Sequence, residues 1–347
     1  MTETPSPAPS VSPEPLMQML NGLQVTAILQ AGLQLRVFDQ IAAGKDQAGT
    51  IAAAIDADER GTRILLDALA ALELLERDDD RYRLSPLADA FLVSSQPTYL
   101  GGAVDIFAPP WVWTSHQRLA EVVRHGGTLL DEHAETPGHA FWATFAPSSV
   151  SLAAPAGQMI VELIGDWSGQ REDLTILDVA CGSGLVSLPL AAQHPRAHTT
   201  LLDWANVLEL TKNNVERLGL HERTSLIEGD MFQVPLGGPY DLIIASHVFH
   251  HFSEQRCLEL LQRLAEVLKT DGRLVIHDFV SGPQPAQAPF PYLFSVRMLT
   301  WTRERQAYSL DTYRKLLQEA GFSEPEVHAS QALPSQVLIA GPAAAGR

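Results

Sequence analysis

Three histidines and one aspartate stand where the chain could move a proton. His247, His250 and His251 follow a short apolar run, Leu242–Ser246, and Asp278 ends a later apolar run. Histidine is the natural general base near neutral pH. The same histidines could instead bind a metal ion, with Asp278 as a further ligand. The pattern therefore indicates base catalysis, with a metal site as the alternative.

A second group of residues could hold a ligand through the backbone. The apolar run Thr175–Val179 leads into the small residues of 180–184 (ACGSG), and a helix-compatible stretch follows. Glycines let a backbone approach a ligand closely, and a helix start offers unpaired N–H groups. Asp203, at the end of the next apolar run, could accept both hydroxyls of a ribose. A glycine turn after one strand and an acid after the next predict a nucleoside-containing ligand.

The residues around this turn favour a cationic ligand. A dinucleotide fingerprint requires a third glycine where Ser187 stands. Asp178 lies inside the strand, and its charge suits the sulfonium and ammonium groups of S-adenosylmethionine better than a pyrophosphate. After a third apolar run, Asp230 could accept from an adenine amino group, and Met231 and Phe232 could lie against the ring. We therefore expect S-adenosylmethionine and rank a nicotinamide dinucleotide below it.

Alternating strands and helices must position these residues. Short buried strands separated by helices are typical of a parallel α/β sheet, which binds ligands at the carboxyl ends of its strands. The expected strands are Thr175–Val179, Thr199–Leu202, Ser225–Glu228, Leu242–Ser246, Leu274–Asp278 and Gln336–Ala340. The expected helices lie near Leu185–Ala192, Val207–Leu218, Glu254–Leu268 and Asp311–Ala320.

The N-terminal part of the chain predicts a module for association. Residues 1–15 are rich in Pro, Ser and Thr and are expected to be a disordered tail. Leu16–Ala43 is apolar on too many sides for a solitary surface helix, so we expect one face to pack against a second copy. Packing wholly within one chain is the alternative.

The next stretch, Thr50–Leu92, has the outline of a winged helix. A helix at Ile51–Ile55 precedes an N-cap at Asp58 and a helix over 59–75, and Asp78–Asp80 forms a polar turn between two short strands. Winged helices often bind DNA, but residues 45–89 hold six basic and eleven acidic residues. We therefore interpret the module as a dimerisation and substrate-covering unit.

Composition narrows the class of protein. The 347 residues carry a formal net charge of −17, a poor balance for binding phosphates of nucleic acid. Of the two cysteines, Cys181 lies in the glycine turn, which argues against a structural disulfide and fits a reducing cytosol. No apolar run approaches the roughly 20 residues that span a bilayer, and the acidic N-terminus does not resemble a secretory signal. A cytoplasmic protein without a membrane segment is expected.

Aromatic side chains gather between the two halves and near the last helices. They suit the wall of an apolar substrate pocket and an ordinary helical core equally well. The residues assigned to the pocket are Phe141, Trp142, Phe145, Met159, Phe294, Met298 and Trp301.

Taken together, the motifs resemble those of class I S-adenosylmethionine-dependent small-molecule O-methyltransferases of the plant caffeate and bacterial acetylserotonin types. The run 178–184 (DVACGSG), Asp203, the Gly-Asp-Met-Phe of 229–232 and Ser246–Glu254, which is similar to K-x-x-x-H-D-W-x-D, carry the resemblance over roughly residues 16–342. It implies a Rossmann-like domain with a mostly parallel seven-stranded sheet at 166–347. It also implies a winged-helix dimerisation domain at 16–100 and a helical linker and substrate cover at 101–165.

The resemblance implies a metal-independent homodimer that methylates a hydroxyl of a small aromatic or polyketide-like molecule. Its catalytic histidine falls on His250, with Asp278 as the supporting carboxylate. The cofactor residues fall on Asp178, Gly182, Asp203, Trp204, Asp230, Met231, Phe232 and Ser246.

This chain departs from the family pattern near the base. Ser246 stands where the family has lysine, and His251 and Phe252 replace the Asp and Trp after the catalytic histidine. The second supporting acid should lie near Ala307, where there is none, and Glu304 is out of register. A C-methyltransferase on the same scaffold and a non-catalytic winged-helix ligand-binding regulator are the alternatives.

Overall fold

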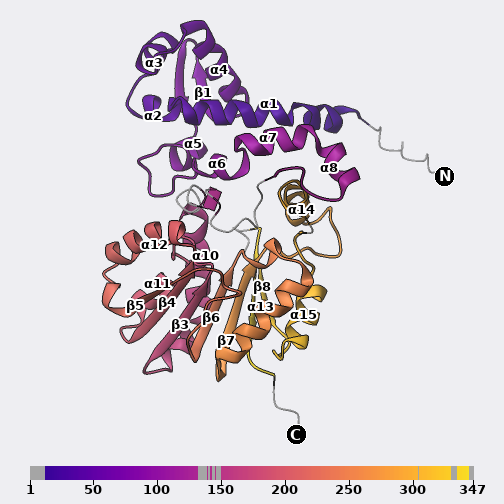
Figure 1. The fold of residues 1–347 in the computed structure, drawn as a ribbon. Helices are drawn as coiled ribbons and strands as arrows, with labels where there is room; N and C mark the ends of the chain where they lie inside the picture. The colour runs from indigo at the N-terminus through magenta and orange to yellow at the C-terminus, as the bar shows by residue number, and fades with distance from the viewer. Residues whose placement is uncertain are drawn as a thin grey trace, which may run out of the picture. The chain divides into compact units, whose positions relative to one another are not determined.

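The computed structural model describes residues 12–131, 139, 141–142, 145, 150–303, 305–329 and 334–343 (Figure 1). The chain divides between Val104 and Asp105 into two compact units. No helix in the described ranges is both long and apolar enough to cross a membrane.

The first unit is a helical module with one β-hairpin. Its core joins apolar residues of the short helices and both strands, including Phe38, Leu66, Leu69 and Tyr82. The elements are α1 (Glu14–Gln34), α2 (Val37–Ala42), α3 (Ala48–Ala54), α4 (Glu59–Ala71), β1 (Leu75–Asp78), β2 (Arg81–Leu84) and α5 (Pro86–Phe91). The antiparallel pairing of β1 with β2 confirms the predicted hairpin.

The long N-terminal helix was predicted wrongly in two places. Helix α1 begins at Glu14, inside the expected tail, of which residues 1–11 lie outside the described ones. The helix also breaks at Arg36, whose φ of 56° is left-handed, so that Val37 and Phe38 of α2 turn into the core of this unit. Helical spacing alone continues across such a break because the buried residues keep the same approximate period.

The apolar surface of α1 is divided along its length. Leu16, Met19, Leu20 and Leu23 are each more than 60% exposed, whereas Ile28, Leu29 and Leu33 pack against the core of this unit. An exposed apolar helix face of this kind marks an association surface.

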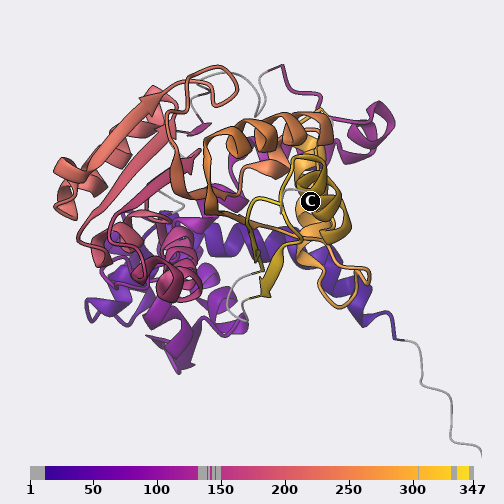
Figure 2. The same cartoon turned by 90° about the horizontal axis from the view of Figure 1, so that it is seen from below.

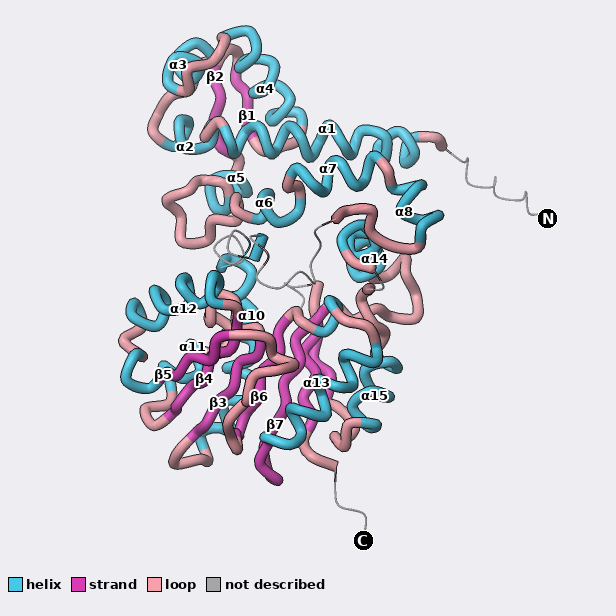
Figure 3. Tube along the Cα trace, in the orientation of Figure 1, coloured by secondary structure: helices cyan, strands magenta, loops and turns pink. Residues whose placement is uncertain are grey.

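The second unit has the predicted α/β architecture (Figures 1 and 3). Helix α6 (Ala103–Phe107) spans the boundary between the units, and α7 (Pro110–Gln117), α8 (Leu119–His125) and α10 (Val150–Gly169) precede the sheet. The strands are β3 (Leu174–Val179), β4 (Ala197–Asp203), β5 (Thr224–Glu228), β6 (Tyr240–Ser246), β7 (Leu268–Asp278), β8 (Glu326–Ala329) and β9 (Gln336–Ala340). The helices between them are α11 (Leu188–Gln193), α12 (Ala205–Arg217), η1 (His221–Arg223), η2 (Phe249–His251), α13 (Glu254–Val267), α14 (Phe290–Trp301) and α15 (Leu310–Glu319).

The seven strands form one mostly parallel sheet in the order β5-β4-β3-β6-β7-β9-β8. Of the seven described strands, six run in the same direction, and β9 runs antiparallel between β7 and β8. All six expected strands are present. The seventh, β8, escaped prediction from its residues because its four-residue sequence, EVHA, lies mostly at the surface and has no apolar run.

Both faces of the sheet are covered by helices (Figure 2). Alternate residues of a strand point to opposite faces, so Ile243 and Leu274 pack with α13 and α15, while Ile244 and Val275 pack with α10 and α11. Burial on both faces explains why these strands read as continuous apolar runs. The strand order reverses between β3 and β6, and ligands of open α/β sheets bind at such a point.

We expect Asp58→Ala to destabilise the first unit by about 1 kcal/mol, because Asp58 Oδ1 accepts a 2.7 Å hydrogen bond from the Gly61 N–H at the start of α4. The unfolding free energy measured in urea tests this. Asp58→Asn keeps a cap and should change stability by only a few tenths of a kcal/mol. An equal loss in both variants would contradict a capping role.

Candidate active site

A cavity of about 360 Å³ lies at the carboxyl ends of β3, β4, β6 and β7 in the second unit. The glycine turn, Asp203, the loop after β5 and the histidine loop form one part of its wall, and aromatic side chains form the other. Predicted site residues in its lining are Gly182, Asp203, Trp204, Asp230, Met231, Phe232, Ser246, His250, Phe141, Trp142, Phe145, Phe294, Met298 and Trp301.

The glycine turn is held open by its backbone conformation. Gly182 and Gly184 have φ values of 54° and 75°, and a Cβ on Gly184 would lie 2.9 Å from Leu188 Cδ1. A Cβ on Gly182 would meet nothing within 4 Å, so the missing side chain leaves space in the cavity. Thr211 and Asn214 of α12 donate to the carbonyl oxygens of Gly182 and Ser183 and fix the turn.

Asp203 connects this turn to the end of β4. Its Oδ2 accepts from the Gly182 N–H and its Oδ1 from the Trp204 N–H, both at 2.8 Å. Burial raises the pKa of Asp203 to about 6, although both hydrogen bonds act in the opposite direction. Each oxygen of Asp203 accepts one hydrogen bond, so the ionised carboxylate has lone pairs left for a ligand.

Asp178 was expected beside the ligand, but it does not line the cavity. The Ser187 hydroxyl donates to its Oδ2 at 2.5 Å, and its Oδ1 has no hydrogen-bond partner among the described residues. Burial raises the pKa of Asp178 to about 7. Ser187, at the position of the missing third glycine, is therefore the partner of the strand acid.

The loop after β5 contributes three of the expected residues. Asp230 Oδ1 accepts from the Phe232 N–H at 2.9 Å, and its Oδ2 accepts from Gln233 at 3.0 Å. Met231 and Phe232 are buried against the sheet and line the cavity. Arg256 lies over the Phe232 ring with its Cζ 3.5 Å from the centroid.

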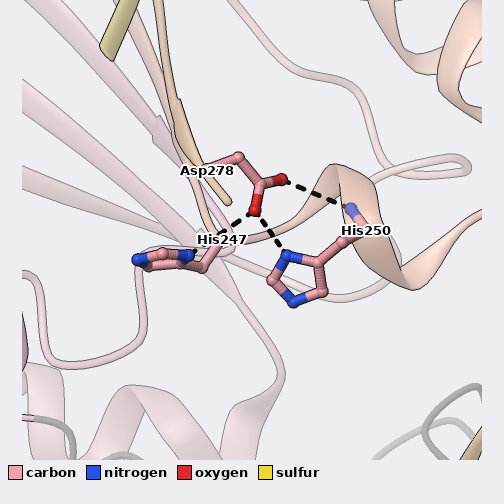
Figure 4. A group of neighbouring side chains, drawn as sticks. All are labelled: His247, His250 and Asp278. Carbon is pink, nitrogen blue, oxygen red and sulfur yellow. Dashed lines mark hydrogen bonds and ion pairs between the residues drawn. The ribbon is translucent and has the colours of Figure 1, made fainter. Parts of the chain in front are cut away.

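His250 and Asp278 form the predicted pair (Figure 4). His250 Nδ1 lies 2.5 Å from Asp278 Oδ1, and both residues are buried. The carboxylate also accepts from the Phe279 N–H at 2.8 Å and from the Tyr313 hydroxyl at 2.9 Å. Burial raises the pKa of Asp278, but the contacts with His250 and His247 outweigh it and hold this pKa well below its usual range.

This pairing determines the tautomer of His250. An ionised carboxylate only accepts hydrogen bonds, so Nδ1 carries the proton and Nε2 presents a lone pair. His251 Nε2 lies 3.1 Å from His250 Nε2, so with His250 protonated at Nδ1 the hydrogen bond between them is donated by His251. Burial, and then the neighbouring His250, lower the pKa of His251 well below its ordinary value.

His247, His250 and Asp278 also meet the spacing of a metal site, with their ligand atoms within 4.8 Å of one another. The 2.5 Å separation of His250 Nδ1 from Asp278 is that of a direct hydrogen bond, which occupies the nitrogen. His247 Nδ1 lies 3.6 Å from the same oxygen. The geometry of this cluster therefore favours a base and its orienting acid.

Ser246 lines the cavity, but its hydroxyl is engaged. Ser246 Oγ lies 2.9 Å from His277 Nδ1, and His277 Nε2 lies 2.7 Å from Ser335 Oγ. Burial lowers the pKa of His277 to about 3, so this imidazole is neutral. The two hydroxyls and the ring form a chain across β6, β7 and the start of β9.

The aromatic wall is built from the expected residues with one correction. Phe141 and Trp142 contact Trp301 of α14 at centroid distances of 4.5 and 5.3 Å, and Trp142 meets the His251 ring at 5.1 Å. Met159 is absent from the lining, because it packs against the cluster under α10. The apolar pattern of α10 does not distinguish its cavity side from its sheet side.

Sequence reasoning missed Tyr313 and Arg297. Tyr313 lies 35 residues from Asp278 and has no motif of its own, whereas Arg297 interrupts the apolar stretch of α14 and could have been noticed as a charge there. At the expected place of a second acid, Ala307 is buried and its N–H donates to Ser295. Glu304 lies outside the described residues.

We expect Asp203→Asn to change the pH dependence of stability. Between its ordinary pKa of 3.8 and the raised value of about 6, the native state retains a proton that the unfolded chain has lost, so the Asp203 contribution to stability falls as pH rises. Asparagine does not titrate. The unfolding free energy of the variant should therefore gain on the order of 3 kcal/mol relative to the parent between pH 4 and 7.

Urea unfolding at pH 4, 5.5 and 7 measures this difference. Asp105→Asn, at an exposed position, should show no such trend. A difference for Asp203→Asn that stays constant with pH would contradict the raised pKa.

Comparison with known proteins identifies the family. Residues 166–323 match the O-methyltransferase domain, and residues 17–94 match the O-methyltransferase dimerisation domain. The chain is 30% identical to 3-hydroxy-5-methyl-1-naphthoate 3-O-methyltransferase of Streptomyces sahachiroi over 92% of both chains. It is 29% identical to the N,N-dimethyltransferase OxyT of Streptomyces rimosus over 93% of this chain and 94% of that protein.

The fold has close counterparts among solved structures. Human N-acetylserotonin methyltransferase, solved in complex with S-adenosylmethionine, superposes with a TM-score of 0.84 at 23% identity and covers 98% of this chain and all of that one. Two family domains in sequence and a relative aligned over almost the whole length lead to one conclusion. The chain belongs to the O-methyltransferase family and is a methyltransferase.

Proposed function

We propose that this enzyme transfers a methyl group from S-adenosylmethionine to a hydroxyl of a small aromatic or polyketide-like molecule, with His250 as general base. The observation that carries the proposal is the buried pair of His250 and Asp278, 2.5 Å apart, in the same cavity as the glycine turn. The naphthoate O-methyltransferase activity of the Streptomyces sahachiroi relative supports an aromatic acceptor.

The residues at the strand ends fit S-adenosylmethionine. Gly182 leaves space for a ligand against the backbone, and the Asp203 carboxylate would accept from ribose hydroxyls. Asp230 would face the adenine amino group, with Met231 and Phe232 against the ring. Trp204 and Ser246 complete this part of the wall. Bound there, the cofactor supplies an electrophilic methyl group on its sulfonium.

His250 would accept the proton of the acceptor hydroxyl at Nε2. Asp278 holds the opposite nitrogen and stabilises the imidazolium that forms, and Tyr313 holds Asp278. The His251 N–H occupies the Nε2 lone pair in this structure, so the acceptor hydroxyl would take its place. The neutral His251 ring would not compete for the proton.

The aromatic wall would orient the acceptor and exclude water. Phe294 contacts His250 edge to face at 4.8 Å, and Trp301 lies two turns further along α14. Flat rings on several sides restrict an aromatic acceptor to few orientations. Alignment of this kind is a main source of rate for a reaction whose methyl donor is already activated.

The first unit would join two copies of the chain. Within the proposed division into 16–100, 101–165 and 166–347, the dimerisation domain contains the exposed apolar face of α1. Burying a leucine side chain contributes about 1.5–3 kcal/mol, so a row of them would hold a homodimer together. The linker, 101–165, would cover the acceptor.

We expect His250→Ala to lower turnover by about 100-fold or more while S-adenosylhomocysteine binds with unchanged affinity. Methylation of the best acceptor from a panel of phenols and polyketide-like hydroxyls is followed by mass spectrometry, and NMR of the product identifies the methylated atom. His198→Ala, on the exposed side of β4, is the control. Retained turnover in His250→Ala would exclude this residue as the base.

We expect Leu20→Glu combined with Leu23→Glu to convert the dimer to a monomer, because both side chains are more than 60% exposed on α1 in a single chain. Light scattering after size exclusion should show the molar mass fall from twice the chain mass to the chain mass. Leu218→Glu, at another exposed leucine, should leave the dimer intact. A double variant that stays dimeric would place the interface elsewhere.

A further inference from the structure

Arg297 is a buried cation in the aromatic part of the cavity. It lies on α14 and is 9% exposed. The guanidinium donates one hydrogen bond, to the Ile106 carbonyl oxygen, and its Cζ lies 5.5 Å and 5.4 Å from the ring centroids of Phe107 and Trp111. No carboxylate pairs with it anywhere in the described parts of the chain.

Burying the Arg297 charge lowers the stability of the fold unless a partner compensates for the lost hydration. Removing a charge from water without an ionic partner costs several kcal/mol, so buried arginines normally have a carboxylate beside them. Burial lowers the pKa of Arg297 to about 10, which still leaves it a cation at neutral pH. A hydrogen bond to one carbonyl and two ring faces only partly replaces the lost water.

Arg297 lines the cavity and has donors to spare. A guanidinium has five N–H groups, and that of Arg297 forms one hydrogen bond within the described ranges. The guanidinium nitrogens that form no hydrogen bond are not completely buried, and Arg297 is part of the cavity lining. The unused part of the guanidinium therefore keeps some solvent access on a residue that lines the cavity.

The charged side chains in the cavity wall differ in their partners. The lining carboxylates, Asp203 and Asp230, come from the strand ends where the nucleoside is proposed to bind. Of the other lining arginines, Arg256 pairs with Glu259 and Arg305 donates to the His251 carbonyl oxygen. Arg297 lies on α14 with Phe294 one turn before it and Trp301 one turn after it. The chain has a net charge of −17, so acidic partners are plentiful, and a cation that has none among the described residues and lies among aromatic rings indicates a site for an anionic ligand.

We propose that Arg297 binds a carboxylate of the methyl acceptor, and that the acceptor is a hydroxylated aromatic carboxylic acid. The planar fork of arginine matches a carboxylate with two parallel hydrogen bonds. The rings of Phe294 and Trp301 would enclose the aromatic part between Arg297 and His250. This inference rests on the proposed function, since it names the acceptor class of that site.

Binding of three related compounds tests the inference without requiring turnover. The probes are 6-hydroxy-2-naphthoate, 3-hydroxy-1-naphthoate and the uncharged 2-naphthol, and quenching of tryptophan fluorescence reports occupancy beside Trp301. We expect the parent enzyme to bind at least one carboxylate tenfold or more tighter than 2-naphthol. Arg297→Gln should remove that preference and leave 2-naphthol affinity within twofold, and Arg297→Lys should restore part of it.

Arg303→Gln is the matched control, because it removes the same charge at an exposed position just beyond α14. Equal affinities of the parent for carboxylates and naphthol would overturn the inference, and so would an equal loss of all three in Arg297→Gln. If Arg297→Gln fails to fold, the comparison of probes on the parent decides.

Titrations with and without S-adenosylhomocysteine separate this inference from the proposed function. Absence of S-adenosylhomocysteine binding would contradict the methyltransferase mechanism, whereas the carboxylate preference is measured independently of it.

Discussion

The parallel register of β6 and β7 is the constraint on which the rest of the site depends. Ser246, at the end of β6, pairs with His277 of β7, so Asp278 lies directly beside the start of the histidine loop. One turn of η2 then brings His250 back over the carboxylate. A shift of one residue in this register would turn Asp278 to the opposite face of the sheet and leave His250 without a partner.

Three buried carboxylates of the second unit differ in what surrounds them. Asp278 has two histidines and the Tyr313 hydroxyl as neighbours, and its pKa is held well below the ordinary range. Asp178 and Asp203 have only neutral donors, and burial raises the pKa of both. The acid that works with the base is thus satisfied within the chain, whereas Asp203 in the cavity retains capacity for a ligand.

The departures from the family pattern have local structural explanations. Ser246 replaces a lysine and joins the neutral hydroxyl–histidine chain through His277 and Ser335. His251 replaces an acid and donates to the base, so no second negative charge is placed beside His250. The supporting role expected from a second acid has a partial counterpart in Tyr313, which binds the oxygen of Asp278 opposite to the imidazole. Among the described residues, the base therefore has one anionic neighbour, Asp278.

The sequence by itself determined the alternation of strands and helices and the glycine turn, because strand period and small residues are readable along the chain. The pairing of His250 with Asp278 was implied by the resemblance to a known family. The sequence did not determine the break at Arg36, the edge strand β8 or the side of α10 that carries Met159. In each case a local pattern is compatible with two packings.

Only the tertiary structure decided which polar groups contact one another. Tyr313 reaches Asp278 from α15, Ser187 turns to Asp178, and Arg297 of α14 reaches Ile106 across 191 residues of chain. The contacts of Tyr313 and Arg297 join distant parts of the sequence, and no period or spacing encodes them. The packing of two helix layers on one sheet decides which donors, acceptors and charged groups lie close enough to interact. The electrostatics of the site therefore follow from the fold as a whole.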